Sequence, residues 1–204
     1  MAPGMTSRVA ATVAPLSFLA AALLGGITIE GYSHLRHPLA LLGAMQAPHP
    51  LAFGIFAFVL PGAAGAWVAG GLRARLPAMA GWPTRIGAQL LLLAALAFAA
   101  QGVLPLDAED LDAGRSRYHA TAWLLWALAF PAGATLLAAG LWRTPCWRRL
   151  ALASLAAGVA VVLCGFLASG WIGAALVQRA AFLAWLGWGV LAAAAGRGLS
   201  RGAA

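Results

Sequence analysis

Histidines and carboxylates, the side chains best suited to acid–base and metal chemistry, are rare in this chain and fall into two polar segments. The chain has four histidines and five acidic residues. All nine lie either between residues 30 and 49 or between residues 107 and 119. Imidazole and carboxylate together suit a zinc ion that keeps an open water position. Bound zinc lowers the pKa of its water to about 7, which supplies hydroxide at neutral pH.

Asp107 and His119 bracket the second polar segment, which is the only strongly polar stretch of the chain. Asp107 is expected at the end of one helix and His119 near the start of the next, so we predict that their side chains approach each other. Ser33, in the first segment, completes the predicted catalytic set of Asp107, His119 and Ser33. The predicted metal ligands are His37, His119, Asp107 and His49, with zinc as the metal. The residues predicted to bind an anionic headgroup are Arg36, Arg115 and Arg117.

The first polar segment follows an apolar stretch that ends near residue 29. If a helix continued past that point, Glu30, His34 and His37 would fall at i, i+4 and i+7 and share one face. Pro38 would end this helix because proline disfavours α geometry at the preceding residue. The rest of the segment, up to residue 49, is half apolar and is typical of a re-entrant or surface-lying loop.

Three alternatives stay open for these residues. Asp107 and His119 can pair simply to fix their loop, with the other histidines hydrated at the membrane surface. The histidines can also serve as a pH sensor, since imidazole titrates near neutrality. The acidic run from residue 107 to 112 can be a solvated loop, because it lacks the EF-hand pattern. No H-E-x-x-H signature is present to decide for a metal site.

Six long apolar stretches must position both polar segments. A membrane-spanning helix needs about 20 mostly apolar residues, and the stretches that meet this lie at about 9–29, 50–72, 86–104, 120–142, 150–172 and 178–196. We predict an all-α fold, a six-helix transmembrane bundle that forms one integral membrane domain over residues 1–204. The first stretch is longer than a signal-peptide core and lacks a small-residue cleavage site, so we expect it to be retained.

The arginines predict the orientation of this bundle. Thirteen basic residues are present, all of them arginine. Nine lie at the two termini and in the second and fourth loops, and four lie in the first, third and fifth loops. The positive-inside rule then places both termini in the cytoplasm. The two polar segments would face the periplasm or exterior of a cell inner membrane.

Composition excludes several classes of function. Hydrophobic residues make up 63% of the chain and charged residues 9%, which is far from a soluble domain. The net charge of +8 is spread between apolar stretches and forms no basic face, so we expect no nucleic-acid partner. Polar side chains at membrane depth are few, which argues against ion or proton transport. Pro61 and Pro131 are expected to kink their helices and free carbonyls that a neighbour must satisfy.

The segments EGYSHLRHPLALLGAMQAPHPLAFGIFAFVLPG (residues 30–62) and LPLDAEDLDAGRSRYHATAW (residues 104–123) resemble the DUF998 family of bacterial and archaeal membrane proteins. The resemblance covers about residues 25–140 and implies about six helices. It also implies a functional pair, Asp107 and His119, together with Ser33 and Gly43, but no activity.

A more distant resemblance is to the alkaline ceramidase and adiponectin-receptor group of intramembrane metal-dependent hydrolases. Ser33 and His37 match the early Ser-x-x-x-His of that group, and Asp107 matches its aspartate. The late histidine pair is missing, because no histidine follows residue 119.

The sequence therefore predicts an inner-membrane protein with an outward-facing His/Asp site that hydrolyses, with a metal, or binds a lipid-like substrate. The alternative is a non-enzymatic accessory subunit or a carrier of lipids or small solutes.

Overall fold

The computed structural model describes residues 3–77, 79–112 and 114–195, and all regular structure in this part of the chain is helical. The long helices are α1 (Pro3–Ile27), α3 (Leu60–Arg75), α4 (Trp82–Val103), α5 (Gly114–Leu141), α6 (Arg148–Val162) and α8 (Ala174–Ala194). Two short helices accompany them, α2 (Pro50–Gly54) and α7 (Ser169–Ile172). Single turns of 3-10 helix lie at Leu39–Gly43 and Pro145–Trp147, and wider π turns lie at Ile55–Val59 and Leu163–Leu167.

Six of the described segments are long and apolar enough to cross a membrane, which confirms the predicted spans. They are Met5–Ile27, Pro50–Arg75, Trp82–Val103, Gly114–Leu141, Pro145–Leu167 and Ala174–Ala194. The fifth span was predicted to run to about residue 172 but ends at Leu167. The short helix α7 follows it, and Gly173 takes a φ of +94°, a conformation open to glycine, before α8 begins.

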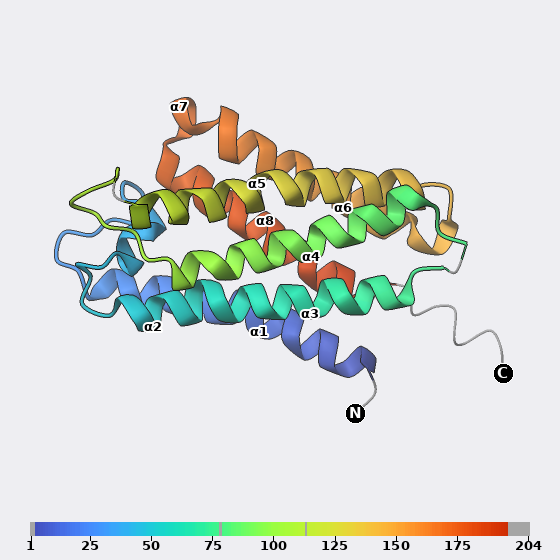
Figure 1. The fold of residues 1–204 in the computed structure, drawn as a ribbon, viewed down its shortest axis with the longest axis horizontal. Helices are drawn as coiled ribbons and strands as arrows, with labels where there is room; N and C mark the ends of the chain where they lie inside the picture. The colour runs from blue at the N-terminus through green and yellow to red at the C-terminus, as the bar shows by residue number, and fades with distance from the viewer. Residues whose placement is uncertain (1–2, 78, 113, 196–204) are drawn as a thin grey trace.

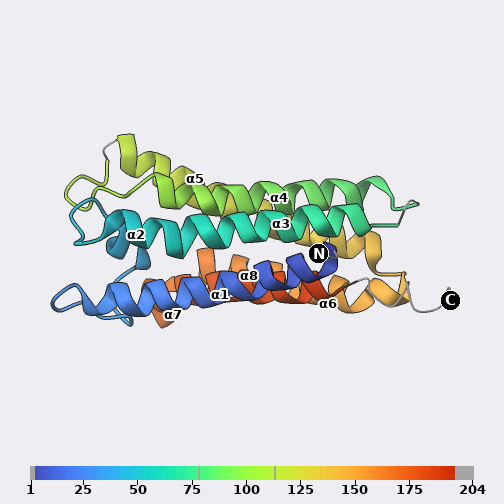
Figure 2. The same ribbon diagram turned by 90° about the horizontal axis from the view of Figure 1, so that it is seen from below.

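The spans form two layers, with α3, α4 and α5 in one layer and α1, α8 and α6 in the other (Figures 1 and 2). Each span packs against its neighbours in the chain, and α8 closes the ring by packing against α1 and α3. Loops 28–49 and 104–113, together with α7, lie at one end of the bundle (Figure 1), which we call the acidic end because all five acids belong to it. The loops that follow α3 and α5 lie at the opposite end, which we call the arginine end.

Aromatic side chains fill the middle of the bundle between the two layers. Phe98 on α4 lies 5.1 Å from Phe182 and 4.2 Å from Trp185, both on α8, between ring centroids. Trp126 on α5 lies 5.0 Å from Phe182, and Phe18 on α1 lies 5.9 Å from the same ring. Such pairs prefer edge-to-face and offset geometries at these distances. The bundle therefore has a buried aromatic centre.

Pro61 disturbs its helix as predicted. The turn before it widens, so that Leu60 N–H donates to the Ile55 carbonyl, and the next carbonyl, that of Phe56, faces a proline nitrogen that cannot donate. Ser17 on α1 supplies the missing bond, because its hydroxyl donates to Phe56 O at 2.6 Å. A polar bond thus joins α1 to this span at a depth where an unsatisfied carbonyl would be costly.

Candidate functional site

Helix α1 ends at Ile27 and does not continue to Pro38, so the predicted shared face of Glu30, His34 and His37 is wrong. Gly31 takes a φ of +72° and turns the chain back, a conformation that favours glycine. A tight turn follows, in which the Ser33 carbonyl accepts from His37 N–H at 2.9 Å and His37 Nδ1 accepts from Ser33 N–H at 2.9 Å. His37, which was predicted to bind metal, therefore uses its Nδ1 to hold the loop.

Arg179, near the start of α8, organises this loop. Its guanidinium donates to the Tyr32 hydroxyl at 2.7 Å and to the His37 carbonyl at 3.1 Å. It also lies 3.4 Å from His34 Nδ1 and donates to Ala175 O at 2.7 Å. All these acceptors are neutral. Charge-assisted bonds of this kind are about twice as strong as neutral ones, so Arg179 fixes residues 32–37 onto α8.

The environment of Arg179 shifts the titration of two neighbours. Burial lowers the pKa of His34, and the nearby charge of Arg179 lowers it further. Burial raises the pKa of Tyr32, although Arg179 opposes this shift through its charge and its hydrogen bond. Both side chains are therefore neutral at pH 7 and present lone pairs to the guanidinium.

Asp107 contacts the first loop and not His119. Its Oδ1 accepts from Gln46 Nε2 at 2.7 Å and from Glu109 N–H at 3.1 Å. Gln46 Oε1 in turn accepts from Ala108 N–H at 3.1 Å. The bond from Gln46 lowers the pKa of the Asp107 carboxyl, with a further contribution from Glu109 N–H. These bonds clamp loop 28–49 to loop 104–113.

His119 is buried in the first turns of α5. Its Nδ1 lies 2.8 Å from the Leu104 carbonyl at the end of α4, and because a carbonyl only accepts, Nδ1 is the donor. Its ring also meets Phe58 edge-on, with centroids 6.3 Å apart. The predicted Asp107–His119 pair is therefore replaced by two separate anchors, one at Leu104 and the other at Asp107 and Ala108.

The predicted zinc ligands do not form a coordination site. Across residues 3–77, 79–112 and 114–195, no three His, Cys, Asp or Glu side chains gather closely enough to hold a metal ion. His37 accepts a backbone N–H at Nδ1, so that its ring proton lies on Nε2, and Asp107 is bound by Gln46. The Nδ1 bond of His119 leaves its Nε2 available, but no second and third ligand among the described residues lie beside it. These residues therefore do not fit a zinc ion in this arrangement.

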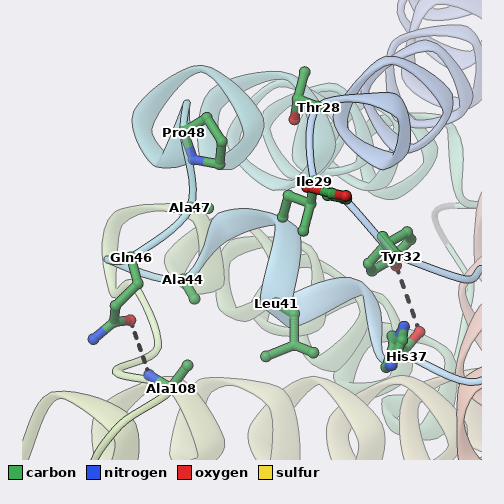
Figure 3. A pocket seen from close by; sticks show the side chains of 12 residues that line it. Thr28, Ile29, Tyr32, His37, Leu41, Ala44, Gln46, Ala47, Pro48 and Ala108 are labelled. Atoms are coloured by element: carbon green, nitrogen blue, oxygen red, sulfur yellow. Dashed lines mark hydrogen bonds between the residues drawn. The ribbon is translucent and has the colours of Figure 1, made fainter.

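A pocket of about 510 Å³ opens between the two clamped loops at the acidic end (Figure 3). Tyr32 and His37 line one side of it, and Gln46, bonded to Ala108, lines the other (Figure 3). Glu30 contributes a carboxylate. We call this cavity the loop pocket; the rest of its lining is Thr28, Ile29, Gly31, Leu41, Ala44, Ala47 and Pro48.

A larger and mostly apolar groove of about 700 Å³ runs along α1. We call it the α1 groove. Thr28 lines both this groove and the loop pocket, and His49 lies in the groove next to Pro48 of the pocket. The groove residues are Val13, Leu16, Ser17, Ala20, Ala21, Leu24, Gly25, Thr28, Leu42, His49, Ala52, Phe53, Phe56 and Leu60.

The arginines predicted to bind a headgroup lie apart from the pocket lining. Arg36 is exposed in loop 28–49, and Arg115 and Arg117 are exposed on the first turn of α5. Sequence reasoning missed Arg179, which looked like one more topology signal, and Gln46, which is a single amide in an apolar loop. The signal for Arg179 was its place inside a predicted span, where a charge usually has a function.

Comparison with family models places residues 12–195 in a family described as protein of unknown function (DUF998). The match extends over the last two spans, beyond the segments that carry the resemblance in the sequence. Comparisons with curated proteins and with solved structures gave no match.

Proposed function

The chain belongs to the DUF998 family, and from the geometry of its acidic end we propose that it binds a lipid-like amphiphile. The apolar tail lies in the α1 groove and the headgroup lies in the loop pocket. Glu30 favours a headgroup that carries an amine, because an ammonium group is attracted to a carboxylate. The surrounding bilayer is both the solvent of the protein and the source of this ligand.

The observation that carries the proposal is that the two cavities adjoin at Thr28, which lines both. The groove follows α1 from Val13 to Thr28, roughly 22 Å at 1.5 Å per residue. Most of its lining lies in two spans, with Thr28, Leu42 and His49 just beyond them, whereas the loop pocket lies beyond the ends of both spans. An apolar cavity at membrane depth beside a polar cavity at the surface matches the apolar tail and polar headgroup of a lipid molecule. Ligand pockets in general are mostly apolar with a few placed polar groups.

Binding is favoured over hydrolysis by the contacts of the predicted catalytic residues. A serine nucleophile needs a base within hydrogen-bond reach. The Ser33 hydroxyl instead accepts from Leu35 N–H at 3.4 Å, while His37 Nδ1 is occupied by Ser33 N–H. Asp107 and His119 serve different anchors. We therefore propose a lipid carrier or a lipid-binding subunit rather than a hydrolase.

The orientation that we propose places the acidic end at the periplasmic or exterior face of the inner membrane. The excess of arginine at the opposite end supports it. Fusion of green fluorescent protein to the C-terminus should then give fluorescent cells, and fusion of alkaline phosphatase should give inactive enzyme. The reverse pattern would place the loop pocket in the cytoplasm.

The binding proposal is tested with the delipidated full chain and phosphatidylethanolamine that carries a spin label on its acyl chain. Electron paramagnetic resonance should show an immobilised lipid fraction that saturates. Ala20 is exposed and lines the groove, so Ala20→Phe should fill it and weaken binding by at least about tenfold, or 1.4 kcal/mol.

Ala132→Phe is the matched control, because Ala132 is exposed on α5 and lines none of the cavities described here. It should leave the immobilised fraction unchanged. Equal binding by the two variants would refute the proposal. Glu30→Gln should reduce the preference for phosphatidylethanolamine over phosphatidylglycerol without removing the immobilised fraction.

A further inference from the structure

We propose that the arginine end carries a second lipid site, selective for an anionic phospholipid, between α5 and α6. It is independent of the α1 groove, which lies along another helix and at the other end. The site consists of an apolar cleft lined by Thr135, Ala138, Ala139 and Leu155, and a polar cavity lined by Pro145, Arg143 and Arg148.

The two parts of this site adjoin at two residues. Trp142 and Arg143 line both the apolar cleft, of about 300 Å³, and the polar cavity, of about 520 Å³. The cleft follows α5 from Thr135 to Trp142, roughly 10 Å at 1.5 Å per residue. This length suits the upper part of an acyl chain, with the phosphate lying beside the arginines.

Charge selects the ligand. The guanidinium of Arg148 lies 5.8 Å from the centroid of the Trp142 ring, a cation–π contact that leaves the positive charge in place. All five acids of the chain lie between residues 30 and 112, in loops of the acidic end. In the described part of the chain neither Arg143 nor Arg148 therefore has a carboxylate to pair with. No acid among the described residues supplies the complementary charge, which in this proposal comes from the phosphate of a lipid.

Arg75 shows that an arginine at this end is not always free to bind a ligand. Its guanidinium donates to Gly71 O on its own helix α3 at 2.9 Å. It also donates to Ala192 O at 3.3 Å and Ala195 O at 2.8 Å, both at the C-terminal end of α8. Arg143 and Arg148, in contrast, are exposed and line the polar cavity. Basic pockets between membrane helices are a recurring mode of binding anionic headgroups.

Native mass spectrometry of the delipidated full chain, titrated with phosphatidylglycerol or phosphatidylcholine of identical acyl chains, tests this site. The wild-type chain should prefer phosphatidylglycerol. The double variant Arg143→Gln/Arg148→Gln should bind phosphatidylglycerol about 30-fold more weakly, the effect of two arginines near an anionic headgroup. Its affinity for phosphatidylcholine should change little.

The matched control is Arg8→Gln/Arg73→Gln, which removes the same charge from exposed residues of the arginine end that line neither cavity. It should keep the preference within about twofold. Equal loss in both double variants would reduce the effect to net charge and overturn the proposal.

Ala139→Phe fills the cleft without changing charge and should weaken both lipids. Inorganic phosphate should not displace phosphatidylglycerol. If inorganic phosphate displaced phosphatidylglycerol, or if Ala139→Phe bound both lipids as tightly as the wild-type chain, no acyl chain would be held in the cleft. Either result would overturn the proposal. Every variant of this set should leave phosphatidylethanolamine binding in the α1 groove unchanged. The two proposed sites are therefore tested independently of each other.

Discussion

Three polar residues of the acidic end differ in their partners from two exposed arginines of the arginine end. At the acidic end, Arg179 and His119 donate to backbone carbonyls, and Gln46 accepts from a backbone N–H and donates to Asp107. At the arginine end, Arg143 and Arg148 face outward beside a cleft. The first arrangement orders long loops over the end of the bundle. The second leaves charge available to the membrane surface. Position near a membrane end therefore does not decide the role of an arginine; the acceptors within its reach do.

The largest effect is expected from Arg179→Met, which removes every bond between the guanidinium and loop 28–49. We expect a loss of about 2–4 kcal/mol in unfolding free energy, since hydrogen bonds to a charged group contribute about 1.5–3 kcal/mol each and are not additive. Unfolding in mixed detergent micelles measures it. Arg143→Met, which lacks such bonds, should change stability by less than about 0.5 kcal/mol. Similar losses would erase the contrast between the two ends.

A smaller loss is expected from His119→Leu, which leaves the Leu104 carbonyl without its donor. An unsatisfied buried acceptor costs about 1–3 kcal/mol. Proteolysis in loop 104–113 should accelerate because one of its anchors is gone. Tyr118→Phe is the control, since Tyr118 is exposed next to His119. A His119→Leu protein as stable as wild type would show that the acidic end does not depend on this anchor.

The smallest effect concerns pH. His34 has a lowered pKa because of burial and of Arg179, so the unfolded chain binds a proton before the folded one does. Its contribution to stability is therefore complete above the unfolded pKa of about 6.5 and is lost as pH falls through the folded value. The charged groups near it are Arg179 and, above its raised pKa, Tyr32.

Thermal unfolding of the wild-type chain should accordingly show a lower midpoint at pH 5 than at pH 7.5. His34→Gln should flatten this dependence in part, while the share due to Asp107, whose pKa is also lowered, persists at more acidic pH. An unchanged profile in His34→Gln would show that the contact with Arg179 does not respond to protonation.

The sequence predicted the spans and the sorting of acids and histidines to one end, because both follow from hydropathy and alternation of loops. Pro61 also correctly predicted a disturbed turn, whereas Pro131 lies inside α5, which is α-helical without interruption. The failures came from side chains whose partners are distant in sequence. No residue near Asp107 in the sequence predicts its contact with Gln46, which precedes it by 61 residues. The i, i+4, i+7 spacing of Glu30, His34 and His37 assumed a helix that Gly31 breaks. The α1 groove is lined by alanine, leucine and phenylalanine, which carry no local signal.

The aromatic centre has a consequence for how a ligand arrives. Because Phe98, Phe182 and Trp185 close the middle of the bundle, a molecule that occupies the α1 groove enters sideways from the hydrocarbon layer. Leu16, Leu24 and Phe56 are exposed along that side. Occupancy would then depend on the mole fraction of the ligand within one leaflet, and encounter rates would follow two-dimensional diffusion. The concentration of the amphiphile in bulk water would hardly matter.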